Sequence, residues 1–225
     1  MPLWKRCLDL AASLAAMPFL VLAILLVAIM QSLVSPGPVF FTQERVGRDD
    51  RRFRIYKFRT MRANADTRVH QAYFHGLIHS NAPMVKLDAR GDSRLIPGGW
   101  LLRAVGLDEL PQLLNVCRGE MSLVGPRPCL PSEYADYLPP QRQRLAATPG
   151  LTGLWQVSGK NRTTFAEMIR LDIEYARTVS LGLDLKIIAL TPVALLREVQ
   201  AARQARQTAG APRDSLLPTT THFIP

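Results

Sequence analysis

The chain has 225 residues, a net charge of +10 and 48% hydrophobic residues. This composition excludes a disordered chain and fits one domain with a sizeable core, or one domain with a small appendage. The three cysteines include no CxxC pair, so neither a disulfide framework nor a zinc knuckle is expected. The basic balance favours anionic partners, namely nucleic acid, anionic lipid or phosphate-bearing substrates, and the aromatic content of only 7% weakens the first of these.

The segment from Leu10 to Val34 contains no charged residue. As a straight helix it would reach about 37 Å at ~1.5 Å per residue, which is enough to cross a hydrocarbon core about 30 Å thick. Pro18 lies inside it and removes a helix hydrogen bond, so a kink or break is predicted there. Arg6 and Asp9 are spaced to pair at the entrance to the bilayer.

Both flanks of this segment are basic, because Lys5 and Arg6 precede it and a dense run of arginine and lysine follows between residues 45 and 59. Positive flanks prefer the cytoplasm. We therefore expect a re-entrant helix hairpin that enters the membrane, bends at Pro18 and returns. An ordinary spanning anchor is the competing interpretation, whereas a signal peptide would need a small-x-small cleavage site that the sequence does not offer.

The pattern next predicts short strands at residues 39–42 and 53–58, joined by a turn over 46–50 as a hairpin. A helix is expected over 61–80, a loop over 88–99 and a helical turn over 100–105. A helix should open at Asp108, tolerate Pro111 in its first turn and stop at Gly119. Thr164 and Glu167 form a capping box for a helix to about residue 178, and another helix runs from about 183 past 197.

Asp108 and Glu109 are the strongest candidates for chemistry. The orphan N–H groups and dipole of a helix start favour negative charge and also welcome a phosphate. An ionised aspartate can attack phosphorus or hold Mg²⁺ through its hard oxygen. Acidic residues at a helix start are also common caps, and spacing alone favours that plainer interpretation.

Four basic residues are candidates for binding phosphate. Lys57 and Arg59 end the second predicted strand, Arg103 lies five residues before the acidic pair, and Arg127 lies in a loop between two prolines. Converging arginines bind phosphates bidentately and offset the charge of a diphosphate. The alternative is that such residues solvate a surface or meet lipid headgroups. The sequence has no Walker-type loop, Rossmann fingerprint or nucleophile elbow.

Several segments together resemble one family, the bacterial sugar transferases of the small monotopic phosphoglycosyl transferase type. Each motif is weak alone, but their order and spacing are specific, and the resemblance covers roughly residues 3 to 197. Larger family members carry extra N-terminal membrane helices, so this chain resembles the minimal form. The segments are Lys5–Asp9, Ser35–Phe41, Gln43–Gly47, Lys57–Met61, Leu107–Gln112, Gly125–Pro128 and Pro149–Gln156.

The resemblance implies an α+β fold that is mostly helical. Residues 1–36 would form the re-entrant membrane helix hairpin, residues 37–207 a compact cytoplasmic catalytic domain with surface amphipathic helices, and residues 208–225 a disordered tail. The expected location is the bacterial inner membrane, with the catalytic domain on the cytoplasmic face.

The resemblance also implies a reaction. Asp108 would attack the β-phosphorus of a UDP-sugar, UMP would leave, and a polyprenol phosphate, usually undecaprenyl phosphate, would take the sugar phosphate. Mg²⁺ would sit with Asp108, and Glu109 would help with metal, proton transfer or positioning. Lys57, Arg103 and Arg127 match family positions that line the phosphate site. The lipid product would begin a glycan such as an exopolysaccharide or O-antigen.

One departure from the family concerns the helix break, where Met17 precedes Pro18 and many members have serine. Serine can satisfy freed backbone groups at such a kink, and methionine cannot. The main alternative function is a non-catalytic basic membrane anchor or scaffold that binds anionic lipid, and a weaker one is a nucleic-acid binder, although the resemblance implies no nucleic-acid partner. The sequence leaves the sugar, the pathway and the oligomeric state open.

Overall fold

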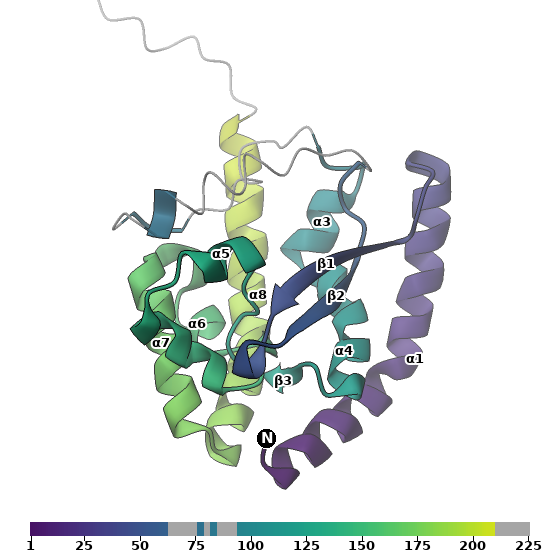
Figure 1. Ribbon diagram of the computed structural model, residues 1–225. Coiled ribbons are helices and arrows are strands. Elements are labelled where there is room, and N and C mark those ends of the chain that lie inside the picture. Colours follow the sequence, from purple (N-terminus) through teal and green to yellow (C-terminus); the bar gives the residue numbers. More distant parts are fainter. Residues whose placement is uncertain (63–75, 79–81, 85–93, 210–225) are drawn as a thin grey trace, which may run out of the picture.

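The computed structural model describes residues 1–62, 76–78, 82–84 and 94–209 (Figure 1). Within these ranges the chain is mostly helical with two small sheets, which confirms the helix-rich α+β class. The predicted helix over 61–80 and tail over 208–225 lie largely outside the described residues. The elements are α1 (Leu3–Val34), β1 (Phe40–Val46), η1 (Arg48–Asp50), β2 (Arg52–Phe58), α3 (Gly99–Ala104), η3 (Leu107–Gln112), α4 (Leu113–Arg118), β3 (Ser122–Val124), α5 (Pro131–Ala135), η4 (Pro139–Ala146), β4 (Gly150–Thr152), α6 (Leu154–Val157), η5 (Lys160–Arg162), α7 (Phe165–Thr178) and α8 (Leu181–Ala209).

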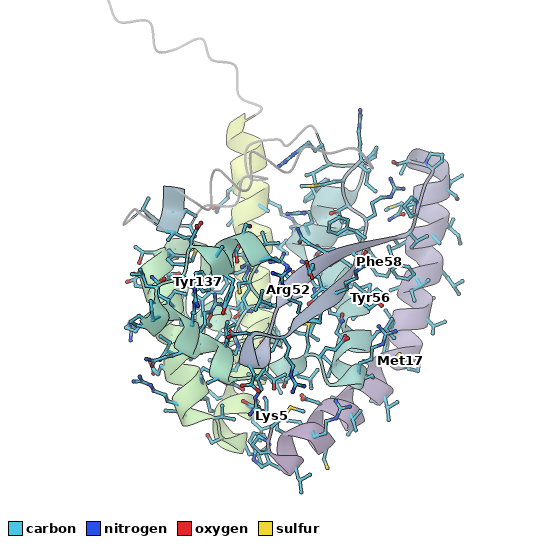
Figure 2. All side chains as sticks on the ribbon, in the orientation of Figure 1. Lys5, Met17, Arg52, Tyr56, Phe58 and Tyr137 are labelled. Carbon is cyan, nitrogen blue, oxygen red and sulfur yellow. The ribbon has the colours of Figure 1, made fainter. Side chains whose placement is uncertain are left out.

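Helix α1 continues through Pro18 as one element, and it changes direction close to Met17 (Figures 1 and 2). Proline has no N–H for the carbonyl one turn earlier, so a bend at this point follows from its chemistry. The expected bend is therefore present, while the two halves form one bent helix and not an antiparallel pair. In the described part of the chain, α1 is the helix whose length and mean hydropathy of 2.7 would allow it to cross a membrane.

One face of α1 packs against the rest of the molecule, and the other is exposed and apolar. Leu20 and Val27 are buried in a cluster with Phe58 of β2, Leu102 of α3 and Leu113 of α4. An exposed apolar surface of this extent marks contact with a membrane or a partner. Its large exposed side chains are Leu14, Phe19, Val21, Leu22, Leu25, Leu26, Ile29 and Leu33.

The N-terminal turns of α1 bind other elements through charged side chains. Arg6 donates to the carbonyls of Val116 (2.6 Å) and Cys117 (2.7 Å) at the end of α4, where helix carbonyls lack intrahelical partners. Asp9 accepts a hydrogen bond from the Leu123 amide (2.9 Å) in β3. The predicted Arg6–Asp9 pair is therefore wrong, because Arg6 binds carbonyls of α4 and Asp9 accepts from Ser122 and Leu123 of β3.

The hairpin predicted after α1 is confirmed. β1 and β2 are antiparallel from Phe40 opposite Phe58 to Val46 opposite Arg52, so the first strand is longer than expected. Their connection contains Asp49 and Asp50 in the left-handed region, which Asp tolerates better than most residues.

A parallel pair, β3 and β4, was not predicted. Glycines allow the backbones beside it to meet: a Cβ on Gly125 would lie 2.1 Å from the Thr148 carbonyl oxygen, and one on Gly150 would lie 2.1 Å from the Gly125 nitrogen. Side chains are excluded at both positions because backbone atoms fill the space.

The remaining predicted helix signals hold. α3 and η3–α4 occupy the expected positions, and Gly119 ends α4 in the left-handed conformation. Thr164 and Glu167 cap α7 reciprocally. α8 is longer than predicted and passes through Pro192.

Candidate functional site

Asp108 and Glu109 lie in the first turn of η3. Gly106, with φ +74°, turns the chain from α3 into η3 and occupies the cap position. Neither acidic residue occupies the N-cap position, so the plainer interpretation of the pair as N-caps is not what the structure shows. Asp108 is only 6% exposed, whereas Glu109 is half-buried.

Glu109 forms an ion pair with Lys57, which lies near the end of β2, at 2.5 Å between Nζ and Oε1. Burial alone would raise the pKa of Glu109, but the Lys57 ammonium, with smaller contributions from Lys160 and Arg127, holds that pKa well below its usual range. The Glu109 side chain is 44% exposed, so solvent weakens these interactions without changing their sign. Glu109 is therefore an ionised group held by a lysine, and a poor proton donor near neutral pH.

Arg127 approaches the same region from the loop after β3. Its guanidinium pairs with Glu133 of α5 (3.1 Å), whose side chain is 1% exposed. Burial would raise the pKa of Glu133, but Arg127 and Arg45 outweigh it and lower the pKa. Burial and the neighbouring Arg127 in turn lower the pKa of Arg45 to about 10. Arg127 and Arg45 are thus two neighbouring cations that share the buried carboxylate of Glu133.

Lys160 is a site residue that the sequence did not reveal. It begins η5 with φ +45°, directly after Gly159, and its ammonium lies 3.7 Å from Glu198 of α8. Its charge also lowers the pKa of Glu109, which places it on the same side as the acidic pair. In the sequence, the one hint that Lys160 belongs to the site was its position shortly after the Pro149–Gln156 segment. Its closeness to Glu109 and Glu198 is visible only in the fold.

Arg59 does not join this cationic group. Its guanidinium donates to the Pro38 carbonyl (2.7 Å), the Ser35 hydroxyl (3.1 Å) and the Ser35 carbonyl, while Gln31 donates to the Arg59 carbonyl (2.8 Å). Arg59 is 5% exposed, and these acceptors use most of its donors. The prediction that Arg59 binds substrate phosphate is therefore corrected: it ties the C-terminal end of α1 to β2. Arg103 lies half-buried in the last turn of α3, which packs against η3.

No group of three or more His, Cys, Asp and Glu residues that could hold a metal occurs among the described residues. Mg²⁺ usually needs fewer protein ligands, because one or two carboxylates combine with substrate phosphates and water. The buried Asp108 carboxylate, adjacent to Glu109 and its cations, fits that second pattern, in which an anionic substrate completes the site.

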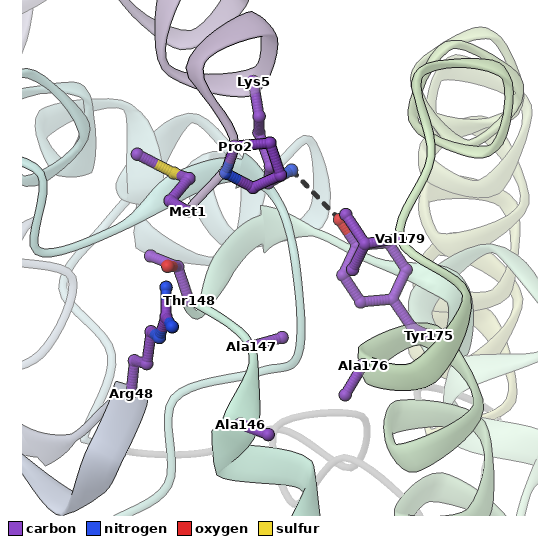
Figure 3. Close-up of a pocket in the computed structure, with 10 residues that line it drawn as sticks. All are labelled: Met1, Pro2, Lys5, Arg48, Ala146, Ala147, Thr148, Tyr175, Ala176 and Val179. Carbon is purple, nitrogen blue, oxygen red and sulfur yellow. Dashed lines mark hydrogen bonds between the residues drawn. The ribbon is translucent and has the colours of Figure 1, made fainter.

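A cavity of about 210 Å³ lies elsewhere, at the N-terminal end of α1 (Figure 3). Lys5, Arg48, Thr148 and Tyr175 are among its lining residues, and Lys5 extends from α1 to donate to the Tyr175 hydroxyl (3.0 Å). None of its lining residues belongs to the group around Asp108. This cavity is therefore separate from the candidate site, which the charged groups define.

Glu109, with its lysine and arginine neighbours, and the adjacent buried Asp108 form a site suited to an anionic substrate. Leu110 of the same turn packs against the hydrophobic cluster that contains the apolar helix α1. Residues 1–198 match the model of the bacterial sugar transferase family. The chain belongs to this family, and it is a transferase.

Three relatives illustrate the similarity. The chain is 41% identical over 189 residues to the galactosyl transferase CpsE of Streptococcus agalactiae, covering 83% of this chain and 41% of that one. It is 41% identical over 200 residues to a UDP-glucose:undecaprenyl-phosphate glucose-1-phosphate transferase of Caulobacter vibrioides, covering 85% and 69%. It is 38% identical over 192 residues to the exopolysaccharide production protein ExoY of Sinorhizobium fredii, covering 83% of each. The chain thus spans about two fifths of the first relative and most of the other two.

Proposed function

We propose that this protein transfers a sugar-1-phosphate from a UDP-sugar to a polyprenyl phosphate, usually undecaprenyl phosphate, and releases UMP. The observation that carries the proposal is the buried Asp108 next to the Lys57–Glu109 ion pair, with Arg127 and Lys160 also lowering the pKa of Glu109. The name of the Caulobacter relative describes such a transfer of glucose-1-phosphate. This would be the first membrane step in the synthesis of a glycoconjugate.

The proposed reaction has two displacements at one phosphorus. An Asp108 carboxylate oxygen attacks the β-phosphorus, an O–P bond forms, and the bond to the bridging oxygen breaks as UMP leaves with that oxygen. A polyprenyl phosphate oxygen then attacks the same phosphorus, and the Asp108–phosphorus bond breaks to regenerate the carboxylate. Both groups attack as anions, so neither step requires a general base.

The neighbouring charges support this role for Asp108. Lys57, Arg127 and Lys160 can offset the negative charge of the donor diphosphate, which would otherwise repel a carboxylate nucleophile. Glu109 stays ionised and orients Lys57, so we assign it a positioning role and not proton transfer. Mg²⁺ held by Asp108 and the donor phosphates would add positive charge at the leaving group.

We further propose that α1 is re-entrant and that the rest of the chain lies on the cytoplasmic face of the inner membrane. Lys5, Arg6 and Asp9 bind one end of α1 to the same compact body that Arg59 binds at the other end. That body carries many charged groups and is too costly to bury in hydrocarbon. Both ends of α1 should therefore stay on one side, while its exposed apolar face meets lipid. The exposed Leu181, Leu185, Val193 and Leu196 of α8 offer a second apolar surface.

The deciding experiment is a panel of UDP-sugars incubated with the purified protein, Mg²⁺ and undecaprenyl phosphate, with UMP release as the readout. We expect one or a few sugars to give lipid-dependent UMP release. Membrane binding without UMP release from any sugar would instead support the non-catalytic anchor.

A further inference from the structure

The loop that carries Arg127 is fixed through its carbonyl groups. Pro126 and Pro128 have no N–H, so at these positions only the carbonyl is available to hold the backbone. Four consecutive carbonyls accept a hydrogen bond, each from a different donor residue. The bonds are Gly150 amide to Pro126 (2.9 Å), Arg144 to Arg127 (2.9 Å), Arg45 to Pro128 (3.1 Å) and Val46 amide to Cys129 (2.9 Å).

Arg144 of η4 is a fully buried cation, so we do not expect it to touch the substrate itself. It donates to the Tyr137 hydroxyl (2.6 Å), forms an ion pair with Asp172 of α7, and reaches the Arg127 carbonyl with the same guanidinium. A buried charge is stable only when it is paired and hydrogen-bonded. The Asp172 pair supplies the counter-charge, and the bond to Arg127 connects α7 and η4 to the loop.

Arg45 of β1 holds the loop at the next carbonyl. It is 7% exposed and donates to the Pro128 carbonyl and to the Gln43 side chain (2.8 Å). The two peptide units that flank Pro128 are thus each bound by a buried arginine from a different element.

We propose that Arg144 and Arg45 are positioning residues that fix the backbone of Arg127 and so aim its guanidinium at the donor diphosphate. The inference rests on the proposed function, in which Arg127 contacts that diphosphate. An arginine at the end of a free loop would sweep a wide volume, and a displacement of about 1 Å can strongly reduce catalysis. Two buried arginines acting on adjacent carbonyls remove that freedom.

Arg144→Lys is the first test variant, because an ammonium can keep the charge opposite Asp172 but cannot serve three acceptors in a planar fork. Tyr137→Phe is the matched control, since it removes a hydrogen bond from the same buried arginine and leaves the bond to the Arg127 carbonyl. Arg45→Lys tests the loop at the next carbonyl and replaces Arg144→Lys if that variant does not fold.

The first readout, amide hydrogen exchange of the peptide covering residues 125–130, does not depend on activity. We expect exchange to become about tenfold faster in Arg144→Lys, the factor for one lost hydrogen bond to a charged group, and to stay at the wild-type rate in Tyr137→Phe. Equal exchange in Arg144→Lys and wild type, or an equal increase in both variants, would overturn the proposal.

The second readout is a double-mutant cycle on UMP release. Arg144→Lys should raise the KM for the UDP-sugar about tenfold in wild type and leave it unchanged in an Arg127→Ala background, because the positioned group is then absent. Equal effects in both backgrounds would show that Arg144 does not act through Arg127. A wild type that releases no UMP from any UDP-sugar would contradict the proposed function, and the exchange measurement would still decide the role of Arg144.

Discussion

Lys5 in the first turn of α1 forms an ion pair with Asp184 of α8, and neither side chain is more than 3% exposed. The same ammonium donates to the Tyr175 hydroxyl (3.0 Å; Figure 3) and to the Val124 carbonyl (2.8 Å). One lysine therefore joins α1 to α7, α8 and β3. The apolar helix is thus anchored at its start by a buried polar network.

Removing this anchor should destabilise the protein. In Lys5→Met the Asp184 carboxylate stays buried without its cation, which typically costs about 3–5 kcal/mol. Lys186→Met is the control, because Lys186 is exposed on the same helix and such changes usually stay within about 0.5 kcal/mol. Thermal unfolding in one detergent compares the two. Similar melting temperatures for both variants would show that the Lys5 network contributes little.

The re-entrant arrangement predicts that both ends of α1 face the cytoplasm. Single cysteines at Pro2 and Arg48, introduced after Cys7 and Cys117 are replaced by serine, should react with an impermeant reagent in inverted membrane vesicles and stay unlabelled in intact cells. Labelling of residue 2 from outside, with residue 48 protected, would instead indicate an ordinary spanning helix.

Asp108→Asn should abolish the reaction and leave the fold intact. The amide has nearly the same size, and Asp108 does not occupy the N-cap position, but an amide is a far poorer nucleophile and Mg²⁺ ligand. Wild type given UDP-sugar without lipid should release at most one UMP per enzyme and become covalently labelled. An unlabelled wild type, or substantial turnover by Asp108→Asn, would favour direct attack by the lipid phosphate.

Glu109→Gln should reduce the rate about ten- to a hundredfold, as expected when one charge-assisted contact worth ~1.5–3 kcal/mol is lost. The shape of the pH profile should not change between about pH 5 and 8, because Lys57 lowers the pKa of Glu109 and the group is already ionised there. Protonation, with loss of the ion pair, comes only as the pH falls below the usual glutamate range. A limb of the profile that disappears in Glu109→Gln would identify Glu109 as a proton-transfer group.

Arg127→Lys should reduce the reaction rate, whereas Arg59→Lys should reduce the stability of the fold. Arg127→Lys should lose about ten- to a hundredfold in rate, because an ammonium cannot form a bidentate fork with phosphate. Arg59→Lys should lower the melting temperature and leave the KM for UDP-sugar near the wild-type value, because Arg59 binds Ser35 and Pro38. Near-normal turnover by Arg127→Lys would show that its role is structural.

The sequence by itself determined the local features, because each depends on neighbouring residues. Pro18 predicts the bend in α1 through its missing N–H, and Gly119 and the Thr164–Glu167 pair mark helix ends by backbone chemistry. Two strand-like segments with a turn between them likewise predict the hairpin, and the acidic pair stands out at the start of a helix.

The tertiary structure alone decided which charged side chains meet. In the sequence, Arg59 and Lys57 were equal candidates for binding phosphate. In the structure, Lys57 reaches Glu109, whereas Arg59, two residues later, binds Ser35 after the end of α1. Arg6 was expected to pair with a neighbour and instead binds α4, and Lys160 joins the site from far along the chain. A long cation has no preferred partner in its own sequence, so its role depends on which distant carbonyls and carboxylates the packing of the core brings within reach.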